Sequence, residues 1–134
     1  FDMKKFITVL SCALLVVLLA LTMAGCDASG GIKRAYEKAG YTVEVTSSKG
    51  NEWLESNLTE EQKKDLDKYA IIVCKKTTES ATIIKFPSAG AIKEALGEDG
   101  YDKAVESGLI NGNCYLLLPL GLNIPKIIDI FKNA

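Results

Sequence analysis

The sequence predicts an α+β fold in which a four-stranded antiparallel sheet packs against helices, preceded by a hydrophobic leader helix. Three observations carry this prediction. Residues 6–24 contain no charge, several later segments have the alternation or the apolar runs of strands, and others place apolar residues three or four positions apart, as helices do. Because helical and strand-like segments are interspersed, we expect one mixed domain over residues 32–134.

A helix, a strand and a helical connection are expected first. Residues 31–40 carry one apolar stripe that ends at a glycine, and residues 41–47 alternate between apolar and polar side chains, as in a half-buried strand. Residues 52–57 are expected to form a helical turn. The capping-box pattern that starts at Thr59 predicts a further helix, which runs to about Lys68.

Two adjacent strands, a helix, a strand and a terminal helix follow. Residues 70–76 and 81–86 are expected to form a hairpin that ends at a proline. Ser88 is the predicted N-cap of the next helix, which glycines weaken in the middle. Residues 114–118 are the last predicted strand, and the final helix starts near Pro125.

Apart from its terminal helices, this order is βαββαβ, the ferredoxin-like arrangement. Right-handed crossovers would place the first and third strands in the centre of the sheet and the second and fourth at its edges. Cys74 and Cys114 would then lie on opposite edges, roughly 14 Å apart. Because a disulfide needs a much shorter separation, we predict two separate thiols, buried or half-buried.

The second and fourth predicted strands are apolar on both faces over residues 70–74 and 114–118. A sheet covered on one side only would alternate there. We expect the final helix to cover the second face. The alternatives are that this face binds a partner, or that edge strands pair two copies of the chain.

Residues 1–25 have the features of a secretion leader. Lys4 and Lys5 precede an uncharged run of 19 residues, and small residues follow that run just before Cys26. Because positive charge resists crossing a membrane, the chain after the run would lie on the outer side.

The residues Met23-Ala24-Gly25-Cys26 resemble the lipobox of bacterial lipoproteins, with Met where Leu is commoner. The resemblance covers residues 3–26. It implies that Cys26 receives a lipid with palmitate-like acyl chains, and that the chain is cleaved before it. Residues 1–25 would be the signal peptide, and residues 26–31 the lipidated cysteine and a short flexible tether. The residues recognised during processing would be Lys4, Lys5, Met23, Ala24 and Gly25.

Two other interpretations of the leader stay open. An uncharged helix of this length rises roughly 28 Å, so it also fits an uncleaved membrane anchor. Ordinary secretion is the second. The lipoprotein interpretation makes membrane lipid a partner through acylated Cys26 and places the domain at the extracytoplasmic face of the cell membrane.

Composition limits the possible functions. The chain has no histidine, which excludes Ser-His-Asp and Cys-His arrangements and removes the commonest metal ligand. Without residues 1–25, the totals of 16 basic and 17 acidic residues fall to 14 and 16, because Lys4, Lys5 and Asp2 are lost. This balance does not favour nucleic acid as a partner. We predict no enzyme activity, no cofactor and no metal site.

Three groups of residues are candidate sites. Trp53, with Tyr115 or with Tyr41 or Tyr69, could line a ligand pocket or anchor a partner. The carboxylates of residues 98–102 could hold Ca²⁺, but their spacing is not that of a calcium loop. The carboxylates of residues 60–67 could face a cationic partner, although interleaved lysines make a solvated surface the better explanation.

From these observations we predict a membrane-anchored, non-enzymatic binding or interaction module, whose partner is an unidentified protein or small ligand. The first alternative is a structural or assembly accessory of a cell-envelope complex. The second is a hydrolase that depends on carboxylates, which would need two acidic groups in one concave pocket.

Overall fold

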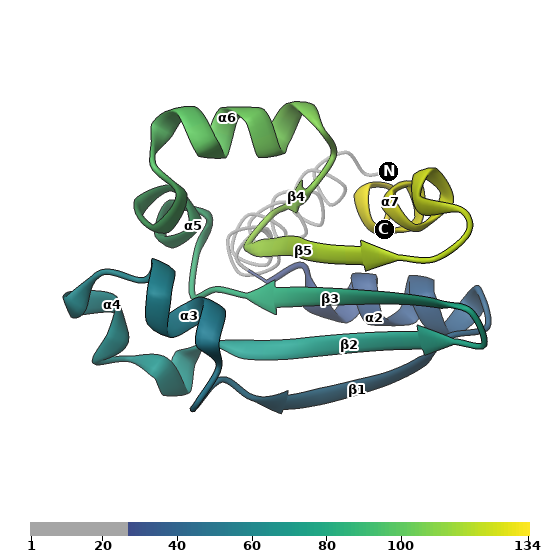
Figure 1. Ribbon diagram of the computed structural model, residues 1–134, viewed down its shortest axis with the longest axis horizontal. Helices are drawn as coiled ribbons and strands as arrows, with labels where there is room; N and C mark the ends of the chain where they lie inside the picture. Colours follow the sequence, from purple (N-terminus) through teal and green to yellow (C-terminus); the bar gives the residue numbers. More distant parts are fainter. Residues whose placement is uncertain (1–26) are drawn as a thin grey trace, which may run out of the picture.

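A five-stranded antiparallel sheet forms the centre of the structure, and helices lie on both of its faces (Figure 1). The computed structural model describes residues 27–134, so the predicted leader and Cys26 lie outside the described residues. The α+β class is confirmed. In the order in which they lie across the sheet, the strands are β1 Thr42–Ser47, β2 Ala70–Lys76, β3 Glu79–Lys85, β5 Cys114–Leu120 and β4 Ile110–Asn111.

The helices connect these strands or flank them. Their bounds are α2 Ser29–Lys38, α3 Glu52–Asn57, α4 Glu60–Lys63, the 3₁₀ helix η1 Leu66–Lys68, α5 Ala89–Leu96, α6 Glu98–Glu106 and α7 Ile124–Lys132.

Local capping signals explain why most predicted helices start where they do. The capping box of Thr59 is present, and the Ser88 hydroxyl accepts a hydrogen bond from the Ala91 amide at 3.2 Å. Gly97, at φ 83°, separates α5 from α6 at the weak point that the sequence predicts. Two details differ: the helix after Thr59 ends at Lys63, before η1, and the short strand β4 was not predicted.

The predicted strand order and strand count are wrong. β1 lies at an edge and pairs with β2, whereas the ferredoxin-like arrangement requires it in the centre beside β3. A crossover along such a strand spans about 20 Å, which needs about 13 helical residues. The connection from β1 to β2 is instead divided into three short helices, so the chain re-enters the sheet where it left and forms an antiparallel neighbour.

Both long connections leave and re-enter at the same end of the sheet. Ser47 pairs with Ala70, Ala70 with Lys85, and Lys85 with Cys114. The two connections that contain α3 to α6 therefore leave the sheet at this end, which we call the helical end of the sheet (Figure 1).

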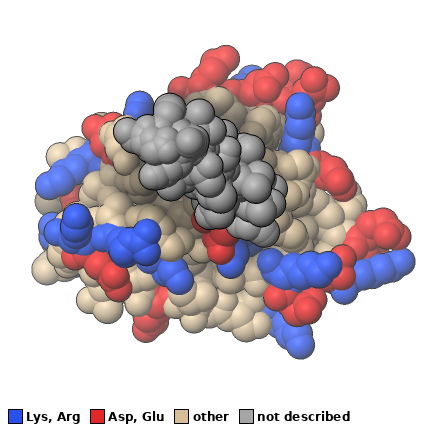
Figure 2. Space-filling view, turned by 180° about the vertical axis from the view of Figure 1, so that it is seen from behind, with Lys and Arg blue, Asp and Glu red and all other residues tan. Residues whose placement is uncertain are grey.

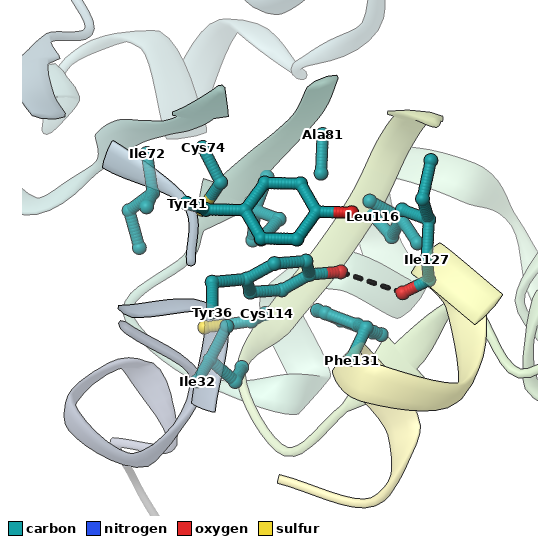
Figure 3. Packing of buried hydrophobic residues seen from close by; sticks show 11 residues of the cluster. Ile32, Tyr36, Tyr41, Ile72, Cys74, Ala81, Cys114, Leu116, Ile127 and Phe131 are labelled. Carbon is teal, nitrogen blue, oxygen red and sulfur yellow. Dashed lines mark hydrogen bonds between the residues drawn. The ribbon is translucent and has the colours of Figure 1, made fainter. Parts of the chain in front are cut away.

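Helices cover both faces of β2, β3 and β5. On one face, α2 and α7 pack against Ile72, Ile83 and Leu116, as Figure 3 shows in part. The neighbouring residues point the other way, and Ile71 and Ile84 pack there with residues of α3 and α5. The prediction that the final helix covers one face is confirmed, and α2 shares that task.

The first described residues are fastened to the helical end of the sheet. The Asp27 carboxylate lies 3.2 Å from the Lys85 ammonium group and accepts two hydrogen bonds from Ser29. The Ala28 amide donates to the side-chain oxygen of buried Asn113 at 2.8 Å. α2 already begins at Ser29, where the sequence predicts a flexible tether up to residue 31. Residues 27–31 are therefore held against the domain and do not form a flexible tether.

The α2–α7 contact contains a buried hydrogen bond that can be tested. The Tyr36 hydroxyl donates to the Ile127 carbonyl at 2.7 Å, and both residues are fully buried (Figure 3). Tyr36→Phe keeps the ring packing and is expected to lower the free energy of unfolding by about 1 kcal/mol in urea titrations. Tyr101→Phe, at a half-exposed tyrosine, is the matched control. Equal effects of the two changes would contradict the assigned role of the Tyr36 hydroxyl.

Candidate functional site

A hollow of about 320 Å³ opens at the helical end of the sheet, where β2 begins and β3 ends. Residues 61–69, from α4 and η1, line one wall, and residues 87–94, from the start of α5, line the other. The two walls come from different connections, which meet because both return to the same end of the sheet. The sequence predicts the helix starts at Thr59 and Ser88 but does not predict that the two helices lie next to each other.

Gln62 joins the two walls. Its side-chain oxygen accepts a hydrogen bond from the Thr59 amide at 3.0 Å, and its side-chain nitrogen donates to the Ala91 carbonyl at 2.8 Å. The residue is 8 % exposed. Because both polar atoms of the buried amide have partners, Gln62 links the start of α4 to α5 beside the hollow.

Tyr69 is one of the residues that line the hollow. Its ring packs edge-on against Phe86, with centroids 5.3 Å apart, and the residue is only 5 % exposed. The hydroxyl forms no hydrogen bond with a described residue. No fully buried side-chain oxygen or nitrogen in the described part of the chain lacks a partner. The Tyr69 hydroxyl is therefore accessible to solvent, and Tyr69 lines the hollow.

The hollow carries more negative than positive charge. Glu61, Asp65 and Glu94 line it together with a single cation, Lys68. Glu61 pairs with a lysine outside the hollow, whereas Asp65, Glu94 and Lys68 form no ion pair with any described residue. Burial raises the pKa of Tyr69, and the negative charges of Glu94 and Asp65 raise it further, so the hydroxyl stays protonated near these carboxylates.

The sequence predicted only part of this site. Asp65 and Glu61 lie within the acidic stretch 60–67, which the sequence marks as a candidate face for a cationic partner. Glu94 belongs to another helix, and the sequence suggests Tyr69 as a binding residue only together with Trp53. The available signals were the capping box and the Ser88 cap, which define helix starts but not their distance in space.

The two predicted binding aromatics, Trp53 and Tyr115, lie together but outside the hollow. Their ring centroids are 5.7 Å apart, and Trp53 also meets Phe86 edge-on at 6.4 Å. Both are half-buried: Trp53 lies on α3 and Tyr115 on β5, and both pack against the buried cluster that includes Leu54, Phe86 and Ile92. This placement gives them a packing role, and a role in binding stays a prediction.

The other predicted site residues take different positions. The carboxylates of residues 98–102 lie on α6, and no acidic or cysteine cluster in residues 27–134 has the geometry of a metal site. Within the same range, no helix is both long and apolar enough to span a membrane. The predicted lipidation and processing residues lie outside the described residues: Cys26, Lys4, Lys5, Met23, Ala24 and Gly25.

Acidic and basic side chains are interspersed on the face of the molecule that Figure 2 shows. Three carboxylates and one lysine line the hollow, which gives it a local excess of negative charge. We take it as the candidate site because this charge lies beside the buried amide link of Gln62.

Cys74 and Cys114 are free and buried, as predicted, but not because they lie on opposite edges. Cys74 on β2 pairs with Ala81 of β3, and Cys114 on β5 pairs with Lys85 of β3. The two cysteines therefore lie on either side of β3 and are also shifted along it by the distance from Ala81 to Lys85. Together these two displacements separate their Cα atoms by roughly 16 Å. Burial raises the pKa of both thiols to about 12, and nearby carboxylates add to the effect.

The described fold defines a class, an α+β domain with a five-stranded antiparallel sheet between two helical layers. Comparison with protein-family models, curated proteins and solved structures gives no significant match. The case for a function therefore depends on the residues of this chain.

The buried thiols should be unreactive in the native protein. At pH 8 a thiol with a pKa near 12 is ionised in about one molecule in 10,000, and burial also blocks access. Peptide mapping after iodoacetamide treatment should find Cys74 and Cys114 unmodified in the native chain and alkylated in urea. Stability should fall as pH rises above about 9, because the unfolded thiols then lose protons that the native thiols keep. Equal alkylation of both samples would contradict the buried placement.

Proposed function

We propose that the protein is a lipid-anchored, non-enzymatic binding module at the extracytoplasmic face of a cell membrane. The observation that carries this proposal is the sequence Met23-Ala24-Gly25-Cys26, which ends immediately before the fastened residue Asp27. A lipid on Cys26 provides anchoring beyond that of a single acyl chain, since two or three chains add their buried methylene groups.

The fastening of Asp27 and Ala28 supports close attachment to the membrane. Burial alone would raise the pKa of Asp27, but hydrogen bonds from Ser29 and from Lys85 together lower it, so the carboxylate stays ionised beside Lys85. With Asn113 bound to Ala28, the domain begins one residue after the proposed lipid site. The helical end of the sheet, and with it the hollow, would then lie near the bilayer.

The composition of the hollow supports binding as the role of the domain. It offers carboxylates, a tyrosine hydroxyl and a rigid amide link, which suit recognition of a polar group. The two described thiols have raised pKa values and no access to solvent, which makes them poor nucleophiles. Trp53 and Tyr115 stay in the proposal as a possible aromatic contact for the partner.

Lipidation can be tested with a matched pair of cysteine variants. In a bacterial host fed radiolabelled palmitate, Cys26→Ser should abolish the label and release the protein from the membrane or stop its processing, because the acceptor sulfur is missing. Cys12→Ser changes the same kind of residue within the leader and should keep the label. A native chain that never takes up palmitate, or labelling that survives Cys26→Ser, would refute the anchor.

A further inference from the structure

We propose that the domain lies on an anionic bilayer with the side that α2 and α7 cover, and that the apolar loop 120–124 inserts among the lipids. The inference rests on the proposed lipid anchor for the position of the membrane, and it names the surface that the membrane contacts. Two independent observations lead to it. One is an uneven distribution of charge among the helices, and the other is a concentration of exposed apolar side chains in one loop.

Positive charge is concentrated on the two helices that cover one face of the sheet. α2 and α7 together carry five basic and two acidic residues, whereas the helices from α3 to α6, including η1, carry four basic and ten acidic ones. The two groups of helices therefore differ in the sign of their charge. The basic residues of α2 and α7 are Lys33, Arg34, Lys38, Lys126 and Lys132.

These cations are available to a partner. Four of the five are exposed, and Lys33 is half-buried. None of the five forms an ion pair with a described residue. The positions that face the sheet are taken by buried apolar residues instead: Ile32, Tyr36, Ile127 and Phe131.

The loop between β5 and α7 gives the second observation. Of the six large apolar side chains that are exposed in the described chain, four lie within residues 118–124. Leu122 is 89 % exposed, and Leu120 and Ile124 on either side of it are exposed as well. Exposed apolar residues gathered in this way are typical of an interaction surface, and their transfer out of water is favourable.

Contacts on both sides of Leu122 fix the conformation of this loop. Gly121 lies so close to Glu79 that a Cβ atom at residue 121 would be 2.6 Å from the Glu79 Cγ. The Asn123 side chain accepts a hydrogen bond from the Lys126 amide at 3.2 Å and so caps α7. Leu122 is therefore held in its exposed position, and little conformational entropy is lost when a bilayer takes it up.

The anchor and the loop lie at opposite ends of the same side of the domain. Ala28 packs against the cluster under α2 and α7, at the helical end. β5 runs from that end to Leu120, a distance of about 20 Å at 3.4 Å per residue. A domain that is attached next to Asp27 and contacts the same bilayer with Leu122 therefore lies with its strands along the surface. The charges then decide that α2 and α7, and not the acidic helices, face the lipid headgroups.

The carboxylates near this surface weaken the attraction only in part. Glu79, beside the loop, accepts a hydrogen bond from the Tyr41 hydroxyl at 2.7 Å, and Asp27 is paired with Lys85. The two remaining carboxylates on α2 and α7 are outnumbered by the five cations. An anionic lipid surface is therefore the complementary partner. The two remaining carboxylates are those of Glu37 and Asp129.

The experiment measures whether the loop contacts acyl chains. The full chain with Leu122→Trp is extracted in a non-ionic detergent and reconstituted into vesicles of phosphatidylcholine and anionic phosphatidylglycerol with brominated acyl chains. Bromine quenches an indole only at short range, so the emission added by this change should be lost, while half-buried Trp53 should keep its emission in the parent chain. Val105→Trp, at an exposed residue of the acidic helix α6, is the matched control and should stay unquenched.

Charge variants test the role of the basic helices. Arg34→Gln combined with Lys126→Gln should lower the ratio of docked to undocked domain roughly 25-fold, since each cation near an anionic bilayer changes this ratio about five-fold. Added salt should act in the same direction. Lys64→Gln combined with Lys103→Gln removes two charges from the other side of the domain and should leave the quenching unchanged.

Four results would overturn the inference. They are quenching of Leu122→Trp no greater than that of Val105→Trp, equal quenching without phosphatidylglycerol, equal effects of the two charge pairs, and emission that follows protein density instead of bromine. The last result would indicate that a second copy of the chain covers the loop. Palmitate labelling of the same preparations separates this inference from the anchor. A labelled chain whose loop stays unquenched keeps the anchor and loses this surface, and an unlabelled chain whose loop is quenched does the reverse.

Discussion

Burial of both faces of the three central strands is the constraint on which the rest of the structure depends. Successive residues of β2 point to opposite sides, so Ile71 and Ile72 each need cover, and the same holds for Ile83 and Ile84 of β3. Each isoleucine left in water would forfeit about 1.5–3 kcal/mol. Helices must therefore lie on both sides of the sheet: α2 and α7 cover one face, and α3 and α5 cover the other.

This division also explains where the polar features gather. Helices α3 to α6 belong to two connections, one from Ser47 to Ala70 and one from Lys85 to Cys114. These four residues pair side by side in the sheet, so both connections begin and end at the same end of it. The hollow forms between these connections, and Asp27 and Ala28 are tied down at the same end through Lys85 and Asn113. A lipid attached next to Asp27 would bring the hollow close to the membrane surface, where a partner in the same membrane can reach it.

Most helices and strands were predicted correctly, whereas their order in the sheet was not, and the difference has a physical reason. Caps, glycines and apolar spacing act between residues close in the chain, and they placed α3, β2 and the Ser88 cap correctly. Strand order depends on whether a connection traverses the sheet or returns to its starting end. Here the connection from β1 to β2 returns to its starting end, and its helix α4 ends already at Lys63. A capping box marks where a helix starts and carries no information on where it ends.

The sequence by itself determined the α+β class, the ends of most helices and strands, and the motif that supports a lipid anchor. Each of these depends on residues that are close together in the chain: caps and apolar spacing define the helices and strands, and a run of four residues forms the motif. Only the tertiary structure decided the strand order, the fastening of residues 27 and 28, and the meeting of Asp65, Tyr69 and Glu94. Those features join residues far apart in the chain, and they exist only once the two faces of the sheet have been covered.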